Sequence, residues 1–143
     1  MRLSALLDAL PPHLAPRLRG SQDDDPIIRG VTYDSRSVSP GDLFVALRGE
    51  NYDGHEYLAQ ALELGAAALL VEAAPVALGS QGCALASVAD RRRALAPIAQ
   101  RFFGTPADEL RLIGVTGTIG KTSTTFLVES ILQAAGIGVG IVG

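Results

Sequence analysis

The spacing of apolar residues predicts a chain in which short strands and helices alternate. Leucines at positions 3, 6, 7 and 10 recur at the spacing of an amphipathic helix, which the pair Pro11-Pro12 ends. Short apolar runs between turn residues predict strands at 27–33, 43–47, 66–71 and 83–88, and two further helices are predicted at 56–64 and 91–103. Strands that alternate with helices indicate an α/β domain, which we expect to cover residues 1–104.

A second domain is predicted to begin at Thr105-Pro106. An apolar strand at 110–115, a glycine-rich loop, a helix at 121–135 and a further strand at 137–142 follow one another. This order is that of a βαβ unit. A complete domain of this kind needs further strands. We therefore expect residues 105–143 to be the opening of a truncated domain, and the chain to be a fragment of a larger protein.

The glycine-rich loop carries residue types that bind polyphosphate. It contains Lys121, the sole lysine among 12 basic residues. Backbone N–H groups of such a loop and of the first helical turn lack intrahelical partners and attract anions. Gly117 and Gly120 allow the backbone to approach a ligand closely. Lys121 can reach the terminal phosphates and the Thr122 hydroxyl can bind Mg²⁺, so the sequence predicts a P-loop that binds a nucleotide.

The predicted nucleotide-binding residues are Gly117, Thr118, Ile119, Gly120, Lys121, Thr122 and Ser123. Among them, Lys121 is the predicted catalytic residue and Thr122 the predicted metal ligand. The strict P-loop spacing requires a glycine where this chain has Val115. A glycine turn that enters an ordinary helix therefore stays an alternative.

Composition narrows the class of protein. With 48% hydrophobic and 19% charged residues, the chain is suited to a packed core. A net charge of −3 gives no support for nucleic-acid binding. No apolar stretch reaches the ~20 residues that span a bilayer, and Asp8 interrupts the first apolar run, so we expect neither membrane insertion nor a signal peptide. The sole cysteine, Cys83, excludes an internal disulfide and favours a cytoplasmic protein, with Cys83 as a small buried hydrophobe.

Two further features leave alternatives open. His55 follows Asp53-Gly54 and could act as a general base, although a structural histidine that caps the next helix is the simpler interpretation. Three consecutive arginines, 91–93, begin a predicted helix, where the helix dipole disfavours positive charge. They could contact a neighbouring domain or a ligand phosphate, although a solvated face is the simpler interpretation.

Two separated blocks of sequence resemble one known family. The first comprises Tyr-Asp-Ser-Arg at 33–36, Val-Ser-Pro-Gly-Asp-Leu-Phe-Val-Ala at 38–46 and Asp-Gly-His at 53–55. The second is Gly-Val-Thr-Gly-Thr-Ile-Gly-Lys-Thr at 114–122. Together with the stretch at 90–104, these blocks resemble the Mur ligases of peptidoglycan synthesis. Within that family they are most similar to the MurE type, which adds the third residue of the stem peptide.

The resemblance implies a fold and a set of site residues. In this family an N-terminal domain holds the UDP-muramoyl substrate, a central domain binds ATP and a C-terminal domain brings the incoming amino acid. An N-terminal α/β UDP-substrate domain is thus implied for residues 1–104, followed at 105–143 by the first βαβ unit of a truncated P-loop ATP-binding domain. The residues implied to lie against the UDP-sugar are Tyr33, Ser35, Glu50, Asn51 and Tyr52.

The implied reaction is ATP-dependent amide formation with Mg²⁺. The D-Glu carboxylate of UDP-MurNAc-L-Ala-D-Glu is phosphorylated, and the amino group of the next residue attacks the acyl phosphate. The implied partners are the UDP-MurNAc-dipeptide, an amino acid and the remainder of the polypeptide, without which we expect the fragment to be inactive.

Three points qualify the resemblance. Thr118 favours the MurE type over the MurF type, which adds D-Ala-D-Ala and more often has serine there. A non-catalytic module that binds a UDP-sugar is the other alternative. The family usually has asparagine at the position of Ile119. Because a β-branched side chain neither bonds the loop backbone nor tolerates unusual torsions well, this departure predicts a weakened ATP loop.

Overall fold

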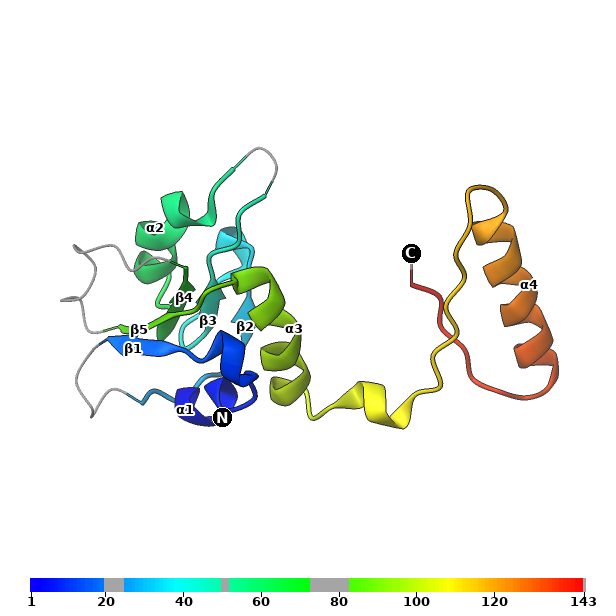
Figure 1. The fold of residues 1–143 in the computed structure, drawn as a ribbon, viewed down its shortest axis with the longest axis horizontal. Coiled ribbons are helices and arrows are strands. Elements are labelled where there is room, and N and C mark those ends of the chain that lie inside the picture. Colours follow the sequence, from blue (N-terminus) through cyan, green and yellow to red (C-terminus); the bar gives the residue numbers. More distant parts are fainter. Residues whose placement is uncertain (20–24, 50–51, 73–82, 143) are drawn as a thin grey trace. The chain divides into compact units, whose positions relative to one another are not determined.

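The computed structural model describes residues 1–19, 25–49, 52–72 and 83–142. It divides into two compact units, Met1–Asp108 and Glu109–Gly143. The first unit holds a five-stranded sheet in the order β1-β5-β4-β3-β2, as Figure 1 shows. The strands are β1 (Arg17–Arg19), β2 (Val31–Thr32), β3 (Leu43–Val45), β4 (Ala68–Val71) and β5 (Ala84–Ser87). The α-helices are α1 (Leu3–Leu7), α2 (Leu58–Glu63), α3 (Arg91–Phe102) and α4 (Lys121–Ala134), and the 3₁₀ turns are η1 (Pro12–Leu14), η2 (Ser35–Ser37), η3 (Gly54–Tyr57) and η4 (Pro106–Glu109).

Four of the five strands are parallel. β2 pairs with β3, β3 with β4 and β4 with β5 in parallel, and β1 is added antiparallel to β5 at the edge. Parallel strands are covered on both faces, which explains the continuous apolar runs from which β4 and β5 were predicted. The sequence analysis missed β1, because Arg17-Leu18-Arg19 is a short, charged edge strand whose Leu18 is exposed.

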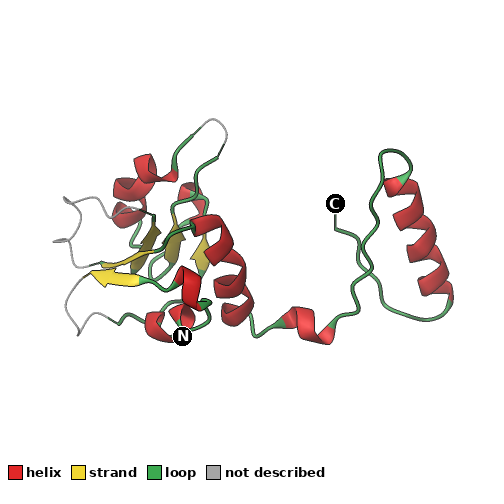
Figure 2. Cartoon of the chain, viewed as in Figure 1, coloured by secondary structure: helices red, strands yellow, loops and turns green. Residues whose placement is uncertain are grey.

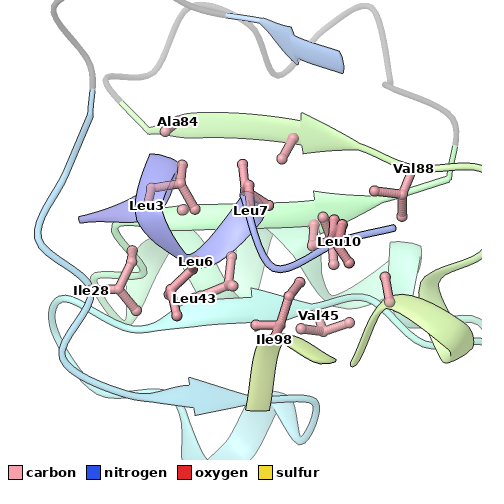
Figure 3. Close-up of a cluster of buried hydrophobic side chains, with 14 of the residues drawn as sticks. Leu3, Leu6, Leu7, Leu10, Ile28, Leu43, Val45, Ala84, Val88 and Ile98 are labelled. Atoms are coloured by element: carbon pink, nitrogen blue, oxygen red, sulfur yellow. The ribbon is translucent and has the colours of Figure 1, made fainter. Parts of the chain in front are cut away.

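Helices α1 and α3 cover one face of the sheet. Leu3 and Leu6 of α1 and Ile98 of α3 belong to one buried cluster with Val45 of β3 and Leu70 of β4. Figure 3 shows the apolar side chains of this cluster gathered around α1, with the strands of the sheet behind them. The first leucines therefore form a helix with one buried face, as their spacing predicted. The helix α1 ends at Leu7, however, and a turn places Leu10 in the core.

Helix α2 covers the other face. Because side chains alternate along a strand, Phe44, Leu69 and Leu85 point away from the α1 and α3 face. They form a second buried cluster with Leu58 and Ala61 of α2. The first unit is thus a three-layer α/β/α arrangement, and the predicted α/β class is confirmed.

The strand predicted at 27–33 is shorter in the structure. Only Val31–Thr32 pair with β3, whereas the amide of Ile28 bonds the carbonyl of Met1 at 2.7 Å. Residues 27 and 28 therefore pair with the start of the chain instead of extending the sheet. The apolar pattern could not distinguish these two partners, because it does not show to which segment the backbone is hydrogen-bonded.

The second unit contains α4 but lacks the two predicted strands beside it. Residues 110–115 and 137–142 run as loop, as Figure 2 shows, so the prediction of strands there is wrong for this structure. A strand is defined by the partner to which its backbone is hydrogen-bonded, and these segments have apolar sequence without that pairing. The predicted domain boundary at Thr105-Pro106 falls beside η4, which spans the division between the units.

Candidate functional site

A cavity of about 850 Å³ lies where the parallel strands β2 and β3 end. In open parallel sheets, ligands bind beyond the carboxyl ends of the strands, because loops and helix N-termini converge there. Among the described residues, thirteen line the cavity: Tyr33, Asp34, Ser35, Arg36, Phe44, Leu47, Arg48, Gly49, Tyr52, Gly54, Tyr57, Gln60 and Arg92.

The turn after β2 is organised by the carboxylate of Asp34. Asp34 caps η2 by accepting a bond from the Arg36 amide at 3.0 Å. It also accepts from Nε and Nη2 of Arg36, at 2.9 and 2.7 Å. The Arg36 side chain holds the pKa of Asp34 down, to about 2, so the carboxylate stays ionised at all physiological pH values. This bidentate pair fixes the guanidinium at the cavity wall.

The segment after β3 supplies a further part of the cavity wall. The amide of Gly54 bonds the carbonyl of Leu47 at 2.8 Å, and the amide of Gly49 bonds the carbonyl of Tyr52 at 2.9 Å. The Tyr52 ring lies directly against Gly49, because a Cβ there would stand 2.9 Å from the ring. Gly49 therefore allows the phenol ring to line the cavity.

The three arginines in the first turn of α3 have different surroundings. Asp90 caps the helix, since its carboxylate accepts a bond from the Arg93 amide at 2.9 Å. Arg93 stays exposed beside Asp90, whereas Arg92 lines the cavity and donates to the Arg48 carbonyl at 3.4 Å. Arg91 is only 2% exposed, so the interpretation of a solvated arginine face is wrong for Arg91. A helix advances about 100° per residue, which explains the separation.

Chemically, the cavity combines cations with aromatic rings. Arg36, Arg48 and Arg92 surround it together with three tyrosines, Tyr33, Tyr52 and Tyr57. Guanidinium groups match the geometry of phosphate oxygens, and tyrosine rings provide flat surfaces for a planar base or a sugar. The volume lies within the range of small-molecule sites. The arrangement is thus suited to a ligand with a phosphate group and a ring system.

Three of the residues predicted to contact the UDP-sugar meet in this cavity. Tyr33, Ser35 and Tyr52 all line it, while Glu50 and Asn51 lie outside the described residues. The role of these residues in ligand binding stays a prediction. Sequence reasoning did not single out Arg48 or Tyr57. The unfavourable position of arginines at a helix N-terminus had raised contact with a ligand phosphate as an alternative for residues 91–93, and among them Arg92 lines the cavity.

The contacts of His55 and the burial of Cys83 indicate structural roles for both residues. The cap of η3 is Asp53, which accepts from the backbone amide of His55 at 3.0 Å, and Nδ1 of His55 lies 2.9 Å from the same carboxylate oxygen. The residue that caps η3 is therefore Asp53, and the predicted capping role of His55 is wrong. Burial raises the pKa of the Cys83 thiol to about 11, so Cys83 is a poor nucleophile near neutral pH.

The glycine-rich loop at 117–123 forms a separate candidate site at the start of α4. Gly117 and Gly120 adopt φ angles of 153° and 81°, which side chains with a Cβ rarely adopt. Gly120 occupies the N-cap position without a side-chain cap, so the first N–H groups of α4 are available to an anion. Nζ of Lys121 donates to the Gly117 carbonyl at 2.5 Å, which folds the ammonium back over the loop. Ile119 is 93% exposed at the loop tip.

The residue types and geometry of this loop fit a polyphosphate. Donors from the backbone converge at the helix N-terminus, and the sole lysine lies over them.

Among the described residues, no helix is long and apolar enough to cross a bilayer.

Comparison with known proteins gives a consistent result. The model for the Mur ligase family, catalytic domain, matches residues 27–103. The UDP-N-acetylmuramyl-tripeptide synthetase of Roseiflexus sp. is 47% identical over 145 residues, covering 100% of this chain and 27% of that protein. The UDP-N-acetylmuramoyl-L-alanyl-D-glutamate–2,6-diaminopimelate ligase of Chlorobaculum tepidum is 47% identical over 125 residues, covering 87% and 24%. The chain thus spans about a quarter of the length of these relatives.

Solved structures of the same family resemble the chain. A crystal structure of MurF from Acinetobacter baumannii has a TM-score of 0.66 and 31% identity, covering 92% of this chain and 27% of that one. The MurF ligase of Thermotoga maritima in complex with ADP has a TM-score of 0.56 and 29% identity, covering 80% and 25%. With a family model that matches more than half of its residues, and relatives and folds that agree, this chain belongs to the Mur ligase family.

Proposed function

We propose that the chain is the substrate-binding and nucleotide-loop portion of an ATP-dependent ligase of peptidoglycan synthesis. The ligase adds the third amino acid to UDP-MurNAc-L-Ala-D-Glu. The single observation that carries this proposal is the cavity at the ends of β2 and β3, because its arginines and tyrosines suit a nucleoside diphosphate linked to a sugar. The names of the relatives support the same substrate.

In this proposal the first unit holds the UDP-sugar. Arg48 and Arg92, which are neighbours in the cavity wall, contact the diphosphate, and Tyr33 and Tyr52 lie against the base or the sugar. Ser35 provides a hydroxyl at the end of β2. Arg36 contributes through the N–H donors that its bidentate pair with Asp34 does not use.

The second unit contributes the loop that receives ATP. The N–H groups at the start of α4 bind the phosphates, Lys121 moves from the Gly117 carbonyl to the terminal phosphate, and Thr122 contributes a hydroxyl to Mg²⁺. Bound Mg²⁺ would neutralise charge that develops on the transferred phosphoryl group. The residues that align the D-Glu carboxylate and the incoming amine belong to further parts of a complete ligase, so this chain alone is inactive in the proposal.

A MurF-type ligase is the second candidate, because the similar solved structures named above are MurF enzymes. The MurE type is preferred because relatives named for the third-residue reaction are up to 47% identical to this chain. The two candidates differ in their UDP substrate, which carries a dipeptide for MurE and a tripeptide for MurF.

Calorimetric titration with UDP-MurNAc-L-Ala-D-Glu, and separately with Mg²⁺-ATP, tests the proposal. We expect saturable binding of the UDP compound, and a loss of affinity on the order of tenfold for Arg92→Met, because a charge-assisted contact to phosphate is removed. Arg93→Met is the matched control, since Arg93 pairs with Asp90 outside the cavity. Absence of binding of the UDP compound, with ATP binding retained, would overturn the proposed role of the first unit.

The exposed Ile119 provides a test of the nucleotide loop. In a full-length ligase that contains this segment, Ile119→Asn should raise turnover, because asparagine can hydrogen-bond the loop backbone. Steady-state kinetics with varied ATP measure the effect. No gain in turnover would show that the isoleucine does not weaken the loop.

A further inference from the structure

The buried side chain of Arg91 connects three parts of the first unit. Its Nη1 donates to the carbonyl of Ala46, at the end of β3, and lies 2.9 Å from Nδ1 of His55. Its Nη2 donates to Oε2 of Glu72, after β4, at 3.2 Å. Oδ1 of Asp53 stands 3.7 Å from Nη1. One guanidinium therefore joins two strand ends to the segment that follows β3.

That segment carries walls of the cavity. We call residues 47–49 and 52–55 the loop base. The base is closed by the bonds from Gly54 to Leu47 and from Gly49 to Tyr52, and an isolated bridge pairs Arg48 with Asp53. Arg48 and Tyr52 face the cavity from one end of the base, while Asp53 and His55 meet Arg91 at the other. Movement of Arg91 would therefore be transmitted to the cavity wall.

Burial of Arg91 is an unfavourable way to stabilise the fold alone. Burying a guanidinium carries a desolvation penalty that apolar packing would avoid. Within the part of the chain that the structure describes, Nε of Arg91 and Nε2 of His55 are buried without a hydrogen-bond partner. The presence of a buried arginine here is better explained by the positions in which its hydrogen bonds hold the neighbouring segments.

We propose that Arg91 is a positioning residue that holds the loop base so that Arg48 and Tyr52 face the ligand. This inference rests on the proposed function for the identity of the ligand, but not for the mechanical link. Lysine cannot replace arginine here, because one ammonium cannot supply the planar set of donors that reaches Ala46, His55 and Glu72 together.

Amide hydrogen exchange of the 143-residue chain tests the link without any ligand. In Arg91→Lys, we expect the amides of Gly49 and Gly54 to exchange about tenfold faster or more, while the β4 amides of Leu69 and Leu70 keep their protection. Arg93→Lys, on the same helical turn, should change neither set. Unchanged exchange at Gly49 and Gly54 would overturn the proposal.

Loss of protection throughout β4 would also overturn it, because Arg91 would then hold the fold and not the loop base. Glu72→Gln is the milder second variant, since it keeps the shape of the acceptor and removes its charge. It should accelerate exchange at Gly54 by a few-fold in a chain whose sheet stays intact. No acceleration at Gly54 in that variant counts against the proposal.

Binding of UDP then separates positioning from a general structural role. We expect Arg91→Lys to weaken UDP binding about tenfold, and the double variant Arg91→Lys/Tyr52→Ala to lose clearly less binding free energy than the sum of the two single losses, with the remaining effect of Arg91 acting through Arg48. Such non-additivity indicates that Arg91 acts through the wall that carries Tyr52. Additive losses would overturn the inference. Absence of UDP binding by the unchanged chain would count against the proposed function, whereas the exchange result would still decide the link.

Discussion

Helices α3 and α4 show how differently two apolar helices of one chain can be used. α3 buries Ala94 and Ile98 against the sheet, although it begins with three arginines and contains Pro97, which removes a helical hydrogen bond. α4 is longer and has no proline, yet none of its described residues is buried. The comparison teaches that an apolar pattern predicts a core only where strands lie alongside the helix, since packing supplies most helical stability in proteins.

The same contrast separates the two units. All buried hydrophobic residues among those described belong to the first unit. The second unit exposes large apolar side chains on α4 and on the segments beside it, such as Leu112, Leu127 and Ile131. A packed sheet is therefore the feature that distinguishes the units, and not the hydrophobic content of their sequences.

The largest expected effect is in amide hydrogen exchange of α3 and α4. We expect the central amides of α3 to exchange at least about 10³-fold more slowly than those of α4, because α3 opens with the packed unit whereas α4 opens alone. Exchange of the intact chain followed by NMR measures both helices in one sample. Equal protection in the two helices would break the comparison.

A matched pair of isoleucines tests burial directly. Ile98→Ala should lower the free energy of unfolding by about 2–5 kcal/mol, because Ile98 is fully buried and its removal leaves a cavity. Ile131→Ala, at a position 68% exposed, should change it by no more than about 0.5 kcal/mol. Urea denaturation followed by circular dichroism measures both. A large loss for Ile131→Ala would indicate that α4 is covered in solution.

Two glycines provide the next pair. Gly54→Ala should cost about 1–3 kcal/mol, since the added Cβ would stand 2.5 Å from the carbonyl oxygen of Leu47. Gly138→Ala, where nothing lies within 4 Å, should be neutral or slightly stabilising. The midpoint of thermal unfolding measures both variants. A neutral Gly54→Ala would contradict the close packing of the loop base.

The smallest effect concerns the exposed turn of the first unit. Arg36 lowers the pKa of Asp34 from 3.8 to about 2, so the stabilising contribution of the carboxylate is present above pH 4 and is lost as the pH falls from about 4 to about 2. NMR titration of the Asp34 carboxyl carbon should give a midpoint of about 2. In Arg36→Met the midpoint should rise toward 3.8. An ordinary midpoint in the unchanged chain would show that the pair does not persist in solution.

Much of the first unit could be predicted from the sequence because its signals are local. Apolar runs between turn residues predicted β3, β4 and β5, and the helix predicted at 91–103 agrees with α3 at Arg91–Phe102. The glycine-rich loop before Lys121 could also be recognised, because its residue types lie within one short segment. The segment Arg17–Arg19 carries no such signal, because an edge strand with charged ends is recognised only by the strand beside it.

By itself the sequence determined the α/β class and the motifs of the family, since both depend on residue types at fixed short spacings. Only the tertiary structure decided which arginine of α3 is buried and which faces the cavity, and that residues 110–115 and 137–142 have no sheet to join. The physical reason is that burial and strand pairing are properties of two segments in contact. A pattern within one segment can show that it is able to pack, but its partner determines whether it does.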